Sequence, residues 1–170
     1  ADIQGKPMLW HVIQGVASAE RIDGVVVLTD SQEGVEAASS WGATVLMTPE
    51  ECPSGTARIA SAIGQLDADI VVNVQADEPL IPPAAINQVA DNLTTHADAG
   101  IATLCEAIGS QAQIDDPNVV KVVIDNLGHA LYFSRSAIPW QGSVSARNCF
   151  RHIGIYAYRV STLNQFVQWA

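Results

Sequence analysis

Lysine is almost absent from this chain. Only Lys6 and Lys121 occur in 170 residues, and 8 basic residues stand against 18 acidic ones, which gives a formal net charge of −10. A protein that binds nucleic acid neutralises phosphates with clustered lysine and arginine side chains. The charge of this chain therefore argues against nucleic acid as a partner.

Several other features are also missing. No apolar stretch approaches the ~18 residues that a membrane span needs, and the chain shows no signal-peptide pattern, so we expect no membrane partner. The three cysteines are far apart without CxxC spacing, which argues against a disulfide framework and a zinc site and favours a reduced, cytoplasmic protein. The signatures GxGxxG and GxxxxGK[ST] do not occur, so dinucleotide-binding and P-loop sites lose their main support.

The residues that are present are mostly aliphatic. Hydrophobic residues make up 48% of the chain and aromatic ones only 6%, a composition that suits one domain with helices layered on a sheet. In the first half we expect strands over 24–30, over 43–47 and up to Gln75, and helices from Pro7, over 32–41 after a Ser31 cap, over 56–66 and from Pro82 to about His96. Strands separated by helices in this way pair in parallel.

The second half changes character. It contains strand patterns over 100–107, 119–125, 129–134 and 152–159 without obvious helices between them, and then a terminal helix with Ser161 as its cap. Asn126-Leu127-Gly128 is a turn signal that joins two of these strands into a hairpin. We therefore expect an α/β fold with a mixed central sheet, mainly parallel at first and with antiparallel additions later.

The stretch from Val71 to Pro79 carries the strongest functional signal. An apolar β-branched run ends in Gln75, Asp77 and Glu78, and Pro79 prevents the strand from continuing. A strand without alternation is typical of burial on both faces in a parallel sheet, and ligands bind beyond the carboxyl ends of such strands. Asp77 then either holds a cation that carries substrate phosphates, usually Mg²⁺, or only caps the next helix or turn.

The loop over 52–58 follows the second strand and opens a helix. Ser54 and Gly55 allow the backbone to approach a ligand, and Thr56 is able to cap the helix, whose first N–H groups suit anions or polar base edges. Arg58 lies in the first turn, where the helix dipole disfavours a cation, so we expect it to have a partner. The alternative is an ordinary loop with a surface arginine.

The strand over 151–159 alternates cleanly. His152, Tyr156 and Tyr158 share one face with Gly154 between them, and such a face is able to bind the hydroxyls of a sugar. The alternative is a half-solvated edge strand. The segment over 134–140, which contains Arg135, is an extended arm that serves either as a lid or as an oligomer contact.

The other chemically versatile side chains have no supporting pattern. We interpret His11, His96 and His129 as structural, because none has a partner at metal-ligand spacing. Cys52 has no local histidine that would support a nucleophile.

Taken together, a set of motifs in a fixed order resembles one enzyme family along the whole chain, the 3-deoxy-manno-octulosonate cytidylyltransferases or CMP-Kdo synthetases. The motifs are GKPM at 5–8, PSGTAR at 53–58, VVNVQADEPLIP at 71–82, NVVKVV at 118–123, LYFSRSAIPW at 131–140 and RHIGIYAYR at 151–159. The resemblance implies a three-layer, Rossmann-like nucleotidyltransferase fold in a single domain over 1–170. It also implies Mg²⁺-dependent conversion of CTP and the acid sugar Kdo to CMP-Kdo and pyrophosphate, for lipopolysaccharide synthesis, by a cytoplasmic homodimer.

The same resemblance implies roles for individual residues. Asp77 matches a metal-binding, catalytic aspartate, and Gln75 matches a catalytic and sugar-site position in the same motif. The nucleotide-side loop is matched by Ser54, Gly55 and Arg58, and the sugar side by Arg135, His152 and Tyr156.

Two family segments have no counterpart in the chain: an N-terminal strand with an Arg- and Lys-bearing phosphate loop, and a C-terminal stretch with a second metal carboxylate. We therefore expect residues 1–170 alone to be inactive. The alternatives are another CMP-acid-sugar synthetase or sugar nucleotidyltransferase, and a non-catalytic dimerising relative; the Kdo-type motifs at 131–140 and 151–159 argue against the former.

Overall fold

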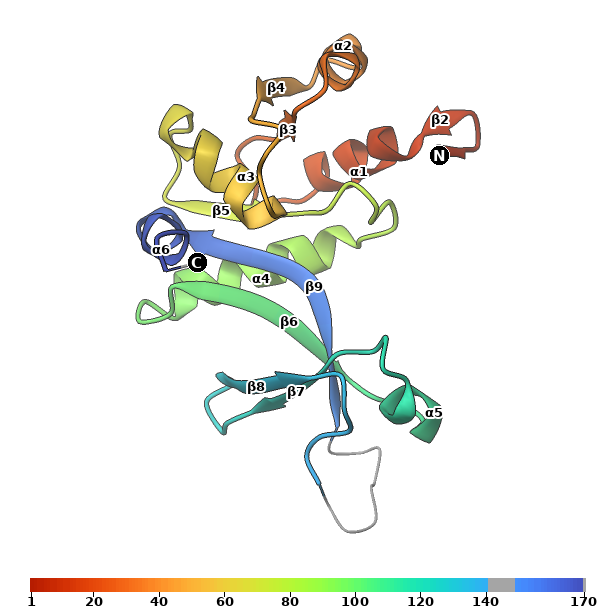
Figure 1. Ribbon diagram of the computed structural model, residues 1–170, viewed down its shortest axis with the longest axis vertical. Coiled ribbons are helices and arrows are strands. Elements are labelled where there is room, and N and C mark those ends of the chain that lie inside the picture. The colour runs from red at the N-terminus through yellow and green to blue at the C-terminus, as the bar shows by residue number, and fades with distance from the viewer. Residues whose placement is uncertain (141–148, 170) are drawn as a thin grey trace. The chain divides into compact units, whose positions relative to one another are not determined.

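A computed structural model describes residues 1–140 and 149–169 (Figure 1). The chain divides into two compact units, the first formed by residues 1–102 with 155–169 and the second by residues 103–154 outside the segment 141–148. None of the helices in the described part of the chain is long and apolar enough to cross a membrane.

The first unit begins with a short hairpin and a helix. Strands β1 (Asp2–Ile3) and β2 (Lys6–Pro7) pair antiparallel, and α1 (Met8–Ala17) follows with Pro7 as its N-cap. Strands β3 (Val26–Thr29) and β4 (Thr44–Met47) then pair in parallel through α2 (Gln32–Ser40). The Ser31 hydroxyl accepts a hydrogen bond from the Gly34 N–H, which confirms the predicted cap of α2.

In the rest of the first unit, a short strand stands between two helices in chain order. Helix α3 (Gly55–Ala62) continues into the 3-10 turn η1 (Ile63–Gln65), and β5 (Ile70–Asn73) leads to α4 (Pro83–Thr95). The carboxyl half of β9 (Phe150–Arg159) pairs antiparallel with β5 and ends at α6 (Val160–Phe166). No side-chain hydrogen bond caps α6, so the predicted Ser161 cap is wrong.

Strand β5 differs from the sequence prediction in its burial. Its residues are all half-buried rather than buried on both faces, and among the described strands it pairs with β9 alone. The β-branched run predicts the centre of a parallel sheet, but its antiparallel partner lies 83 to 89 residues later in the chain. Ile70 pairs with Arg159, and Asn73 pairs with Tyr156. Local hydrophobicity does not encode such a long-range partner. The sheet structure is nonetheless mixed, as expected.

The second unit is built on a hairpin. Strands β7 (Lys121–Ile124) and β8 (Ala130–Ser134) pair antiparallel, which confirms the predicted hairpin. The Asp125 carboxylate accepts hydrogen bonds from the N–H groups of Leu127 and His129, and Gly128 supplies the positive φ of 87° that the turn needs. Most of strand β6 (Ile101–Ala107) belongs to this unit. Helix α5 (Gln111–Asp115) begins after a Ser110 cap, and the sequence analysis did not predict it.

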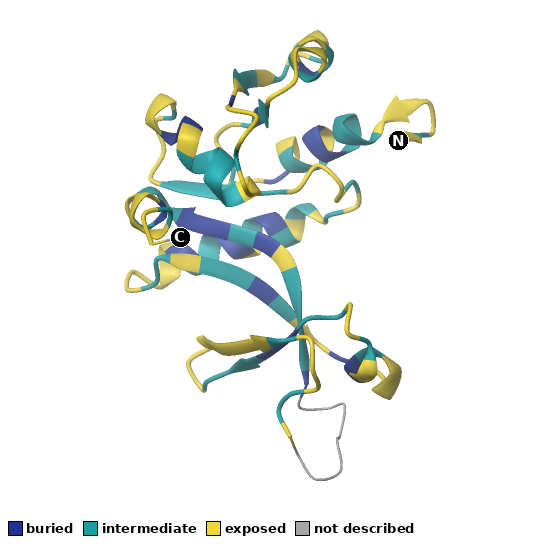
Figure 2. Ribbon diagram, in the orientation of Figure 1, coloured by how far each residue is buried: buried dark blue, intermediate teal, exposed yellow. Residues whose placement is uncertain are grey.

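Buried side chains form separate clusters within the units. Figure 2 colours the ribbon by the burial of each residue. In the first unit one cluster contains Ile13, Val27 and Ala38, and another contains Ile63, Tyr158 and Leu163. The second unit has a cluster of Ile108, Ile114 and Cys149. The cluster around Tyr158 fixes β9 against α3 and α6, and so it positions one wall of the site described below.

Lys121 is fully buried in the second unit, with 0% of its surface exposed. Its ammonium group donates to the main-chain carbonyls of Asp116 at 2.9 Å, Val119 at 2.8 Å and Arg135 at 2.6 Å. An ammonium group has three N–H donors, so these carbonyls satisfy it completely. The interaction joins the segment before β7 to the arm that leaves β8.

We predict that Lys121→Met lowers the free energy of unfolding by roughly 2–3 kcal/mol, because it leaves buried carbonyls without their charged donor. The chain's other lysine is the matched control. Lys6 is exposed and lies 5.5 Å from the Trp10 ring centroid, so Lys6→Met costs about 1 kcal/mol or less. Urea denaturation of both variants measures the difference, and equal losses of stability contradict the prediction.

Candidate active site

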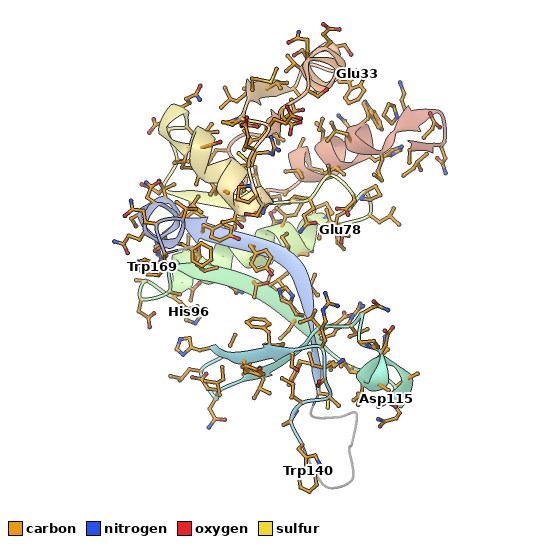
Figure 3. All side chains as sticks on the ribbon, viewed as in Figure 1. Glu33, Glu78, His96, Asp115, Trp140 and Trp169 are labelled. Atoms are coloured by element: carbon orange, nitrogen blue, oxygen red, sulfur yellow. The ribbon has the colours of Figure 1, made fainter. Side chains whose placement is uncertain are left out.

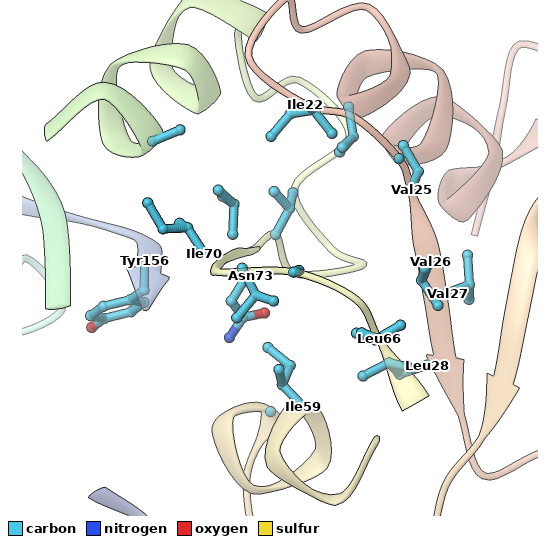
Figure 4. A pocket seen from close by; sticks show the side chains of 18 of the residues that line it. Ile22, Val25, Val26, Val27, Leu28, Ile59, Leu66, Ile70, Asn73 and Tyr156 are labelled. Carbon is cyan, nitrogen blue, oxygen red and sulfur yellow. The ribbon is translucent and has the colours of Figure 1, made fainter. Parts of the chain in front are cut away.

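A cavity of about 1780 Å³ lies within the first unit (Figure 4). Apolar side chains of β3 and β5, including Val26, Leu28 and Ile70, form part of its wall. The polar part of the lining contains most of the residues that the sequence singled out: Ser54, Gly55, Arg58, Gln75, Asp77 and Tyr156. The structure therefore brings together the loop before α3, the turn after β5 and one residue of β9.

The start of α3 contributes main-chain groups to this cavity. Ser54 is extended, with φ −157° and ψ 163°, and its hydroxyl accepts a hydrogen bond from the Ala57 N–H at 3.1 Å. Ser54 is thus the N-cap, and the expected cap at Thr56 is wrong. A Cβ atom at Gly55 would lie in ordinary van der Waals contact with the Asn73 side-chain nitrogen, at 3.5 Å. The N–H groups of a first helical turn have no intrahelical acceptors and favour anions.

Thr56 connects this turn to β9. Its hydroxyl lies 3.2 Å from the hydroxyl of Tyr158, and the Tyr158 ring stacks on Tyr156 with the centroids 6.0 Å apart. Burial raises the pKa of Tyr156, and the nearby Tyr158 phenol adds to the rise. Tyr156 is therefore a neutral hydroxyl at physiological pH, and it faces Asn73 across the β5–β9 pair.

Arg58 has the partner that its position predicted. Its guanidinium forms an ion pair with Asp30 at 2.6 Å and donates to the Thr48 hydroxyl at 2.6 Å and the Pro49 carbonyl at 3.3 Å. The sequence reasoning did not identify Asp30 or Thr48. Each follows the end of a strand, as Asp77 does, and this shared position is the signal that could have found them.

The turn after β5 carries the carboxylates. Gln75, Asp77 and Glu78 are exposed, and Figure 3 labels Glu78. The Glu78 N–H donates to the Gln75 carbonyl at 3.1 Å, which closes the turn. Pro82 is the N-cap of α4 and no side chain caps that helix, so the alternative in which Asp77 caps α4 is wrong. Within the described residues, no group of three or more His, Cys, Asp or Glu side chains surrounds a metal position.

The remaining predicted residues, His152 and Arg135, belong to the second unit. The His152 ring lies 2.9 Å from the Thr103 hydroxyl and meets the Phe133 ring edge-on, and burial lowers the pKa of His152, so the ring is neutral at pH 7. The Arg135 guanidinium donates to the Pro117 carbonyl at 2.8 Å. The sugar-binding roles of His152 and Arg135 stay predictions.

Comparison with known proteins gives one consistent result. A cytidylyltransferase family model matches residues 1–170. The 3-deoxy-manno-octulosonate cytidylyltransferase of Alcanivorax borkumensis is 48% identical over 180 aligned positions, which cover 99% of this chain and 71% of that protein. The protein of the same name from Yersinia pseudotuberculosis is also 48% identical, over 100% of this chain and 71% of its own length.

Solved structures agree with these relatives. The structure of CMP:2-keto-3-deoxy-manno-octonic acid synthetase complexed with CTP matches with a TM-score of 0.95 and 36% identity, over 100% of this chain and 70% of that one. A 4-diphosphocytidyl-2C-methyl-D-erythritol synthase from Anaerococcus prevotii has a TM-score of 0.63 at 9% identity, over 99% of this chain and 66% of that one, and shows a shared fold only. On this sequence and structural similarity, the chain belongs to the 3-deoxy-manno-octulosonate cytidylyltransferase family, the CMP-Kdo synthetases.

Proposed function

We propose that this protein transfers the cytidylyl group of CTP to Kdo, forming CMP-Kdo and pyrophosphate for lipopolysaccharide synthesis. The observation that carries the proposal is the shared cavity, where the open first turn of α3 and the carboxylate turn after β5 meet. One supplies N–H groups that suit an anion, and the other supplies a carboxylate for a cation. A nucleoside triphosphate with its metal needs both.

The reaction needs positioning more than covalent chemistry. The anomeric hydroxyl of the sugar attacks the α-phosphorus of CTP in line and gives up its proton to water. A P–O bond forms to the sugar oxygen, and pyrophosphate leaves with the electrons of the broken P–O bond. The protein contributes by holding the two substrates in this geometry and by stabilising the charge that develops on the phosphate oxygens. In the proposed arrangement, the Ser54–Gly55 turn of α3 faces the nucleotide.

We propose Mg²⁺ as the cofactor, with Asp77 as its protein ligand. The exposed carboxylate in the turn after β5 fits this ion, because Mg²⁺ is commonly held by one or two carboxylates together with waters and substrate phosphates. A dedicated protein cage is not needed for such a site. When bound, Mg²⁺ would supply positive charge at the phosphate oxygens.

For the sugar we propose Gln75, Tyr156, His152 and Arg135. The first two line the cavity, and the neutral Tyr156 phenol suits a sugar hydroxyl. The neutral His152 ring is likewise suited to hydroxyls rather than to an anion. Arg135 would supply the positive charge for the carboxylate of the acid sugar.

We propose that the protein is a homodimer in the cytoplasm. Strand β8 and the arm after it expose large apolar side chains, with Leu131 64% and Trp140 85% exposed (Figure 3). Such exposure on an edge strand favours an interface with a second copy. Cys52 and Cys105 form no disulfide in the described part of the chain, which suits the reducing conditions of the cytoplasm.

The direct test is to supply the full-length protein, rather than residues 1–170 alone, with CTP, Kdo and Mg²⁺ and to measure pyrophosphate and CMP-Kdo. We expect turnover with CTP and Kdo to exceed turnover with UTP or with sialic acid in place of Kdo. Faster turnover with a different nucleotide or acid sugar would contradict the assignment to Kdo.

Asp77→Asn is predicted to lower the Mg²⁺-dependent rate at least about a hundredfold, or ~2.7 kcal/mol, because it keeps the shape and removes the charge that holds the cation. Rates at varied Mg²⁺ measure the effect. Asp98→Asn is the control, since Asp98 is exposed in the loop after α4. If Asp77 only shapes the turn, asparagine replaces it with little loss of rate.

Tyr156→Ala and His152→Ala are each predicted to raise the KM for Kdo or to lower kcat, because each removes a hydrogen bond worth on the order of 1 kcal/mol. The affinity for CTP, measured without sugar, should stay near the wild-type value. His129→Ala is the control, because His129 is exposed in the β7–β8 turn. Equal losses of CTP affinity in the two variants would assign these residues to the nucleotide pocket or to the core.

A further inference from the structure

Arg58 is held on three sides by the protein itself. One guanidinium nitrogen donates to the Thr48 hydroxyl and to the Pro49 carbonyl, and the other forms the ion pair with Asp30. Only 21% of the Arg58 side chain and 35% of the Asp30 side chain are exposed. The position of the guanidinium is therefore set by protein groups.

The acceptors come from the ends of two paired strands. Asp30 follows β3 and Thr48 follows β4, and the Thr48 N–H donates to the Thr29 carbonyl at 2.9 Å, which extends the pairing of these strands. Thr48 is itself buried, with 6% exposed. The guanidinium thus joins α3 to a rigid part of the β3–β4 sheet.

The main chain of Arg58 is tied to the nucleotide-side turn. Its N–H donates to the Ser54 carbonyl at 3.0 Å, and the Ser54 hydroxyl accepts from the Ala57 N–H. Any displacement of Arg58 therefore moves Ser54 and Gly55 with it. The side chain connects this turn to the ends of β3 and β4.

The charge of Arg58 is already compensated. A phosphate that bound the guanidinium directly would have to displace the Asp30 carboxylate or share the cation with it, and the carboxylate would repel the phosphate. As an ion pair, Arg58 and Asp30 together add no net positive charge to the cavity.

We propose that Arg58 is a positioning residue rather than a phosphate ligand, and that it acts together with Asp30 and Thr48 as a clasp on the first turn of α3. This inference rests on the proposed function. The clasp fixes the Ser54–Gly55 turn in the conformation that receives CTP, and Asp30 is as important to that conformation as Arg58.

The test compares Asp30→Asn, Arg58→Gln and the double variant by the affinity for CTP with Mg²⁺, measured calorimetrically at several salt concentrations. The clasp predicts that each single variant weakens binding by roughly tenfold and that the double variant is no weaker than either, because both remove the same interaction. It also predicts that the salt dependence of CTP affinity is the same in the double variant as in wild type, because both charges of the pair are removed together and no cation–phosphate contact is lost. Arg58→Lys should not restore affinity, because lysine lacks the planar fork.

A direct phosphate contact predicts the opposite pattern. Asp30→Asn would then leave CTP affinity unchanged or tighten it, while Arg58→Gln would weaken binding and flatten its salt dependence, and this result would overturn the proposal. Glu106→Gln is the matched control, because it removes the carboxylate of the exposed Arg151–Glu106 pair in the second unit.

Amide hydrogen exchange of the ligand-free protein separates this proposal from the proposed function. The clasp predicts faster exchange at residues 55–58 in both Asp30→Asn and Arg58→Gln, and unchanged exchange in either variant overturns it. If the wild-type protein binds no CTP, both the proposed function and the role assigned to the clasp are refuted. If the wild-type protein binds CTP but the two variants differ in their effects on CTP affinity or on exchange at residues 55–58, the clasp alone is refuted.

Discussion

The placement of the first turn of α3 is the constraint on which the candidate site depends. Two sets of side-chain contacts hold it: Arg58 reaches Asp30 and Thr48 at the ends of β3 and β4, and Thr56 meets the hydroxyl of Tyr158 on β9. The Ser54 cap then closes the turn from within. Because helix N–H groups act over short distances, their use for a phosphate depends on how firmly this turn is held.

The turn after β5 is held in a different way. It contains exposed carboxylates and is closed by a main-chain hydrogen bond between Glu78 and Gln75, without the side-chain clasp that holds α3. Metal ligands that bind together with a substrate benefit from such access to water, because Mg²⁺ keeps several waters when it binds. Under the proposed function, the two sides of the cavity would combine a fixed turn for the anion with an open turn for the cation.

Sequence reasoning identified several local features correctly, although the caps expected at Thr56 and Ser161 were wrong. The Ser31 cap, the hairpin turn at Gly128 and the lining position of Gly55 all follow from side-chain and backbone preferences of a few neighbouring residues. The motif resemblance added what local rules do not contain, namely that residues from α3, the turn after β5 and β9 meet at one site.

The sequence could not supply the partners that lie far apart along the chain. Asp30 is 28 residues from Arg58, and Tyr158 is 102 residues from Thr56, so no periodicity or spacing relates them. The antiparallel pairing of β5 with β9 was missed for the same reason, since an apolar run is compatible with either direction of pairing. These contacts arise from packing of the whole unit.

The most direct measurement of the central claim is amide hydrogen exchange with and without CTP and Mg²⁺. If the cavity of the first unit is the nucleotide site, CTP slows exchange at residues 54–58 and 75–78 and leaves the β7–β8 hairpin unchanged. Protection that appears in the second unit alone, with none at the start of α3, would contradict the account.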